Sequence, residues 1–147
     1  MARLEIDFSE PAVFSLELDV RVGDVNYGQH LGNDRVLLLA QEVRVRWLKS
    51  LGASEASVED GVGLLMTDAA LVYLGQAFMG DVLRGELSVT EVGRAGFVLL
   101  YRFTRPADGR EIARVRTGLV AYDYTRQKIA RLPAVFRAAL PSARPPV

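Results

Sequence analysis

One loop gathers most of the residues that could do chemistry. Residues 24–33 have the sequence DVNYGQHLGN and contain the only histidine of the chain, His30. The strongest helical pattern of the sequence follows directly. The first turn of a helix carries backbone N–H groups without intrahelical partners, and its dipole is positive there. Such donors can hold an anion, or a carbonyl oxygen that becomes negative during a reaction.

Four side chains in this loop and the helix after it are catalytic candidates. His30 is a candidate general base, because histidine titrates near neutral pH. Asp34 and Glu42 are carboxylates that could activate water, and the amide of Asn26 could orient water or a carbonyl group. Each also has a structural alternative. Asn26 suits a turn and Asp34 a helix cap, while a lone histidine is more often a structural hydrogen-bonding residue. Glu42 lies four residues before Arg46, a favourable spacing for a surface ion pair.

Composition excludes several functional classes. In the 147 residues, 18 lysines and arginines balance 18 aspartates and glutamates, whereas nucleic-acid-binding proteins normally carry a basic excess. The chain has no cysteine and one histidine, which excludes disulfides, thiolate chemistry and zinc sites built from several imidazoles. We therefore expect no metal, no cofactor and no nucleic-acid partner. Neither a secretory signal nor a membrane-spanning run is visible, so we expect a cytoplasmic protein without membrane association.

Hydrophobic periodicity predicts the elements on both sides of the loop. Residues 13–22 alternate between apolar and polar side chains, which predicts a half-buried strand. The helix is predicted from about residue 33 or 34 to residue 50, with Asn33 or Asp34 as its cap and Gly52 as its stop. Leu38 falls toward the charged side of this helix. The predicted buried stripe is Val36, Ala40, Val43, Trp47 and Leu51.

After a polar connector, the chain is predicted to form strands joined by tight turns. Consecutive strands with short turns pair antiparallel. One long antiparallel sheet could therefore curl around the helix and bury its stripe, which is an α+β architecture. The predicted strands are residues 63–78, 82–92, 96–104 and 111–124.

The end of the chain completes this plan. A short helix is predicted over residues 133–140, with proline in its first turn, and a loose tail over residues 141–147. No internal repeat or linker divides the chain, so we expect one domain over residues 1–147.

Four short motifs lie on these elements in a characteristic order. They are NYGQHLGN at residues 26–33, QEVR at 41–44, YLGQAFMGD at 73–81 and TGLVAYD at 117–123. Together they resemble the 4-hydroxybenzoyl-CoA thioesterase family, over roughly residues 16–140. In that family the loop has the pattern D-x-x-G-H-V-N-N, the helix E-x-x-R or E-E-x-R, and two long strands join at Y-L-R-P-A-x-x-G-D.

The resemblance implies a hotdog fold, in which a long antiparallel sheet wraps around one central helix. It also implies an acyl-CoA thioesterase that hydrolyses a thioester to free acid and coenzyme A. Gly32 and Asn33 would donate the N–H groups that polarise the thioester carbonyl. His30, Glu42 and Asn26 would be catalytic, but Asn26 stands where the family has its usual aspartate. An amide cannot serve as a general base at neutral pH, so the base could come from His30, Glu42 or Asp34.

Further site residues follow from the same resemblance. Met66, Thr67 and Tyr73 lie on the strand that faces the acyl group in relatives, so they are expected to bind substrate. Ordinary core packing is the alternative, and we favour it for Met66. Relatives share their site between subunits, and the outward Leu38 agrees with this, so we expect a homodimer or homotetramer. A hydratase or dehydratase acting on acyl thioesters, with His30 as base, and a non-catalytic acyl-thioester binder remain alternatives.

Overall fold

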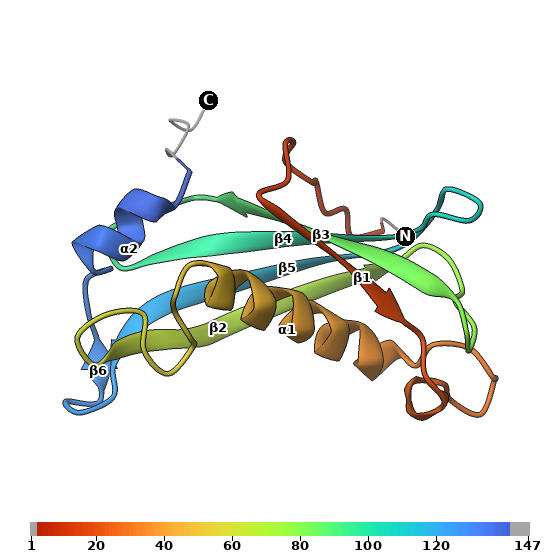
Figure 1. The fold of residues 1–147 in the computed structure, drawn as a ribbon, viewed down its shortest axis with the longest axis horizontal. Helices are drawn as coiled ribbons and strands as arrows, with labels where there is room; N and C mark the ends of the chain where they lie inside the picture. The colour runs from red at the N-terminus through yellow and green to blue at the C-terminus, as the bar shows by residue number, and fades with distance from the viewer. Residues whose placement is uncertain (1–2, 142–147) are drawn as a thin grey trace.

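The computed structural model describes residues 3–141, so the predicted tail after Pro141 lies outside the described residues. An antiparallel sheet with the strand order β1-β3-β4-β5-β2 curls around the central helix α1, and a short strand β6 pairs with β5 (Figure 1). The predicted α+β hotdog fold is confirmed. The elements are β1 (Phe14–Asp19), the 3-10 turn η1 (Val22–Asp24), α1 (Asn33–Ser50), β2 (Val62–Tyr73), β3 (Val82–Thr90), β4 (Gly96–Arg105), β5 (Arg110–Asp123), β6 (Lys128–Ile129) and α2 (Ala134–Ala139).

The apolar stripe of α1 is buried against the sheet, as its 3.6-residue period predicts. Leu51 is an exception at 38% exposed, because it caps the C-terminus beyond the last helical turn. Gly52 then takes a φ of 73°, which confirms it as the stop signal. The buried members of the predicted stripe, each at most 3% exposed, are Val36, Ala40, Val43 and Trp47.

The predicted cap of α1 is wrong. The N-cap residue is Gly32, which has an extended backbone, and no side chain caps the helix. Asn33 and Asp34 already belong to the first turn. The backbone just before the helix is already held by other bonds, because the Leu31 N–H donates to the Ala77 carbonyl and the Gly32 N–H donates to the Asp24 carbonyl.

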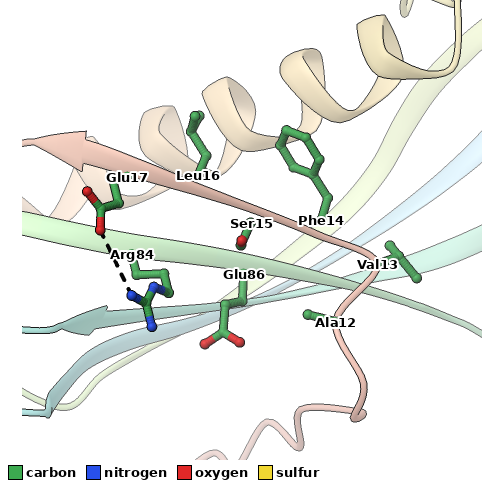
Figure 2. A pocket seen from close by; sticks show the side chains of 8 residues that line it. All are labelled: Ala12, Val13, Phe14, Ser15, Leu16, Glu17, Arg84 and Glu86. Atoms are coloured by element: carbon green, nitrogen blue, oxygen red, sulfur yellow. Dashed lines mark ion pairs between the residues drawn. The ribbon is translucent and has the colours of Figure 1, made fainter.

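Strand β1 keeps the alternation expected from its sequence, and Phe14 and Leu16 extend toward α1 (Figure 2). The hollow drawn there is lined in part by the ion-paired Glu17 and Arg84 and contains none of the candidate site residues. The strand ends earlier than predicted. Val22, expected to point inward, lies in η1 and is 72% exposed.

The segment before β1 covers part of the convex face of the sheet, although no element was predicted there. Ile6 packs with Val72, Val98 and Leu100 in a second apolar cluster, and Phe8 packs against it. Ser88, which the alternation of β3 places on the outer face, is only 2% exposed and lines a hollow together with Ser9, Glu10 and Pro11 of the same N-terminal segment. A face that strand periodicity alone assigns to solvent is therefore partly buried.

Candidate functional site

The loop between η1 and α1 is folded by its own backbone hydrogen bonds. The Asn26 N–H donates to the His30 carbonyl at 2.9 Å, and the Leu31 N–H donates to the carbonyl of Ala77 at 2.7 Å. His30 also forms an isolated antiparallel bridge with Phe78. These bonds attach the loop to the segment after β2, so its position relative to the start of α1 is fixed.

The Asn26 side chain is held in one orientation. Its Oδ1 accepts a hydrogen bond from the Gly28 N–H at 2.9 Å, the geometry of an Asx turn. This is the turn role that the sequence offered as an alternative. The bond occupies the oxygen and leaves the amide NH2 as the part of the side chain that can contact a ligand.

The side chains of His30 and Asn26 both lie close to Gly28. A β-carbon at residue 28 would lie 2.9 Å from His30 Nε2 and 3.3 Å from Asn26 Oδ1, so glycine is needed for this close approach. The Nδ1 of His30 lies 3.3 Å from the Leu31 carbonyl. Since a carbonyl oxygen only accepts, Nδ1 carries the proton and Nε2 is left as an acceptor. A neutral His30 can therefore take a proton at Nε2.

The start of α1 offers two backbone donors. The Gly32 N–H donates to the Asp24 carbonyl at 2.8 Å, so the expectation that Gly32 supplies a free donor is wrong in this structure. Within the described chain, the N–H groups of Asn33 and Asp34 have no hydrogen-bond acceptor. They are the first helical N–H groups, where the helix dipole is positive. An oxygen that becomes negative would be stabilised at this position.

A cavity of about 390 Å³ lies at this helix start. Asn26, Gly32 and Asp34 line it together with Asp24 and Arg35. The structure thus brings three predicted site residues to one cavity and adds Asp24 and Arg35, which the sequence did not assign to the site. The Asp24 carboxylate accepts the Arg21 N–H at 2.9 Å, so it supports the loop.

The substrate-binding candidates on β2 are spread along the strand. Tyr73 reaches the helix start, where its hydroxyl donates to the Asn33 carbonyl at 2.9 Å. Met66 is 40% exposed, which contradicts the core packing favoured for it. Thr67 sits in a bulge of the strand, and its hydroxyl bonds Asp68. Only Tyr73 of these three is joined to the loop–helix junction.

Glu42 lies apart from this junction within one chain. It is nine residues beyond Asn33, roughly 13 Å along the helix axis. Its carboxylate accepts a hydrogen bond from Arg46 Nε at 3.0 Å, which is the surface ion pair suggested by its spacing. A catalytic role for Glu42 would therefore need the site of a second copy of the chain.

Comparison with protein families assigns the chain to a family. The thioesterase-like superfamily model matches residues 20–140, which include the loop, α1 and all strands after it. The chain belongs to the thioesterase-like superfamily. A comparison with curated protein sequences gives no match.

Solved structures agree with this thioesterase-like assignment. A 1,4-dihydroxy-2-naphthoyl-CoA thioesterase from Synechocystis is similar with 25% identity and a TM-score of 0.79, over 86% of this chain and 94% of its own. The gentisyl-coenzyme A thioesterase BH1999 has 18% identity and a TM-score of 0.76, over 87% of this chain and 100% of its own. SAV2348 from Staphylococcus aureus, solved in complex with CoA, has 17% identity and a TM-score of 0.79, over 95% of this chain and 94% of its own. The latter two similarities concern the fold alone.

Neither a cluster of metal ligands nor a membrane-spanning helix is found within residues 3–141. No group of at least 3 histidine, cysteine, aspartate or glutamate residues is arranged there to hold a metal ion. None of the described helices is long and apolar enough to cross a membrane.

Proposed function

We propose that this thioesterase-like protein hydrolyses an acyl-CoA thioester to a free acid and coenzyme A. The observation that carries the proposal is the cavity at the start of α1, which Asn26, Gly32 and Asp34 line, together with the N–H groups of Asn33 and Asp34, which have no acceptor within residues 3–141. Backbone donors of this kind stabilise the oxyanion formed when water attacks a thioester carbonyl. This role needs no carboxylate at residue 26.

His30 is the base that the geometry supports best. Its Nε2 is the acceptor nitrogen and lies beside Gly28, next to the Asn26 side chain. In this mechanism the Asn26 NH2 orients the attacking water or the thioester carbonyl, and His30 accepts the proton of the water. Asp34, which lines the cavity at the start of α1, is the second candidate base.

Release of free thiol from a panel of aliphatic and aromatic acyl-CoAs tests the proposal. Hydrolysis gives one thiol for each thioester consumed, whereas a hydratase changes enoyl absorbance without thiol release. Absence of thiol release from every member of the panel would count against hydrolysis.

A non-catalytic acyl-thioester binder is the second candidate function. The amide of Asn26 in place of the family carboxylate favours it, since an amide does not act as a base. Equilibrium binding of an acyl-CoA that stays intact over many hours would support the binder and reject the hydrolase.

The base assignment makes a separate prediction. His30→Ala should lower kcat by about a hundredfold or more if His30 is the base. Glu42→Gln should cost a similar factor only if the carboxylate acts in the site of a second copy. Both kcat values would be measured on the best acyl-CoA of the panel, with folding checked by circular dichroism. Full activity in both variants would move the assignment to Asp34.

We also propose that the protein is a homo-oligomer, a dimer at least. β2 pairs only with β5 among the described strands. The connector after α1 bonds the start of its other edge, where the Leu64 N–H donates to the Glu55 carbonyl, but beyond Leu64 that edge has no backbone partner within residues 3–141, and Met66 on it is 40% exposed. On α1, Leu38 and Val45 are 48% and 43% exposed. Unpaired strand edges and neighbouring apolar side chains are usually covered by another chain.

Light scattering at micromolar concentration should give at least twice the monomer mass of 16.2 kDa. Leu38→Asp should shift the mass toward monomer, because a buried unpaired charge destabilises an interface. Val135→Asp on α2 is the matched control, since Val135 is 72% exposed and lies on another element. A wild-type protein that is entirely monomeric would contradict the proposal.

A further inference from the structure

A second cavity, of about 740 Å³, lies at the opposite end of the molecule from the candidate site. Three arginines line it: Arg94 from the turn between β3 and β4, Arg131 from the segment before α2, and Arg137 from α2 itself. No aspartate or glutamate lines this cavity. Guanidinium groups stay charged at all physiological pH values, so the cavity is strongly cationic although the whole chain has a formal net charge of zero.

The three arginine side chains lack the carboxylate partners that several other arginines of the protein have. Arg102 and Arg105 each pair with two carboxylates. Within residues 3–141, the side chains of Arg94, Arg131 and Arg137 form no ion pair and no hydrogen bond. Three unneutralised like charges around one cavity repel one another, and a bound anion would remove that repulsion.

The arginines stand on a fixed scaffold. The Leu132 N–H donates to the Arg94 carbonyl at 2.8 Å, which joins the C-terminal segment to the β3–β4 turn. Phe136 on α2 packs against Trp47 and Phe97, with ring centroids 6.5 and 5.9 Å away. The backbone that carries the three guanidinium groups is therefore held in place before any ligand binds.

We propose that this pocket binds a phosphate-bearing small molecule, with a diphosphate held by Arg94, Arg131 and Arg137. Guanidinium groups bind phosphate oxygens through paired, charge-assisted hydrogen bonds. A diphosphate carries enough negative charge to balance three such groups. Val92, Ala134 and Ala138, which also line the cavity, offer an apolar surface to the organic part of the molecule.

The pocket cannot belong to the candidate site of the same chain. Phe136 on α2 contacts Trp47 in the last turns of α1, whereas the candidate site lies at the first turn of that helix. Figure 1 shows α2 at the C-terminal end of α1. The 18 residues of α1 correspond to roughly 27 Å along the helix axis. The diphosphate could therefore come from a separate ligand, or from the nucleotide end of an acyl-CoA whose thioester lies in the site of a second copy.

Titration calorimetry of the purified protein with inorganic pyrophosphate at low salt tests the pocket without any acyl substrate. We expect saturable binding, weakened by about tenfold in each of Arg94→Gln, Arg131→Gln and Arg137→Gln and lost in the triple variant. Arg84→Gln is the matched control, because it removes one exposed arginine charge from β3 and should leave binding unchanged. Thermal unfolding confirms that each variant is folded. No binding to the wild type, or equal binding to the folded triple variant, would overturn the proposal.

The source of the phosphate is decided by kinetics on the same variants. A raised KM for acyl-CoA with an unchanged kcat in the triple variant, together with competition by adenosine 3′,5′-bisphosphate, would assign the pocket to the substrate's nucleotide. An unchanged KM alongside lost pyrophosphate binding would assign it to a separate phosphorylated ligand. If the wild type hydrolyses no acyl-CoA, the proposed function fails while the titration still decides whether the pocket exists.

Discussion

Arg44→Ala is expected to lower the free energy of unfolding by about 3–5 kcal/mol, the range for removing one partner of a buried ion pair. Arg44 lies on the sheet-facing side of α1 and is only 5% exposed. The change would leave polar partners in the interior without their donor, which costs more than the loss of the attraction itself.

The partners of Arg44 explain the size of this effect. Its guanidinium pairs with Glu55, in the connector after α1, and donates to the Tyr101 hydroxyl at 3.1 Å. The Tyr101 hydroxyl lies 3.0 Å from Thr117 Oγ1, and both residues are fully buried. Burial opposes the charge of Arg44, yet its contacts with Tyr101 and Glu55 outweigh burial and raise its pKa. The network joins the helix, the connector and two central strands.

Urea unfolding followed by circular dichroism measures the effect, with Arg46→Ala as the matched control. Arg46 is on the same helix and also pairs with a carboxylate, but its side chain is 57% exposed. Its loss should cost about 0–1 kcal/mol, the usual range for an exposed pair. Equal losses in the two variants would show that the buried network contributes nothing beyond an ordinary surface ion pair.

Asn26→Ala is expected to lower kcat by about tenfold to a thousandfold, the range for losing one well-placed polar group in a catalytic site. This prediction rests on the proposed thioesterase activity. Asn26→Asp should keep activity and could raise it. Its carboxylate can still accept the Gly28 N–H, and the second oxygen would replace the NH2 with a group able to act as base or nucleophile.

Asn26→Ser separates the turn from the chemistry. A serine hydroxyl can also accept the N–H two residues later, so the loop should keep its shape while the amide is lost. We expect kcat for Asn26→Ser to be nearly as low as for Asn26→Ala, measured by thiol release on the same acyl-CoA. Wild-type activity in Asn26→Ser would mean that residue 26 only shapes the loop.

The sequence predicted the fold well because the fold depends on periodicity and turns. The apolar stripe of α1 and the alternation of β1, β3 and β5 are local patterns. When a sheet curls around a helix, the apolar side of each element can be buried only by facing the other element. Local patterns did not reveal the layer formed by Ile6 and Phe8 on the convex face. Local patterns also did not reveal that Arg44 is buried. A buried, paired arginine and an exposed arginine cannot be told apart when both lie in a helix that carries many charged residues.

For the candidate site, the sequence alone determined which residues stand at the loop–helix junction: Asn26, His30, Gly32, Asn33 and Asp34. Their adjacency follows from chain order. Tertiary structure decided which groups of these residues are available. In the folded chain the Gly32 N–H donates to the Asp24 carbonyl, and the Tyr73 hydroxyl donates to the Asn33 carbonyl at the helix start. Glu42 forms a surface ion pair with Arg46. Contacts between segments that are distant in the chain decide which backbone groups are already hydrogen-bonded and which remain available to a ligand. Local sequence patterns contain no information on either point.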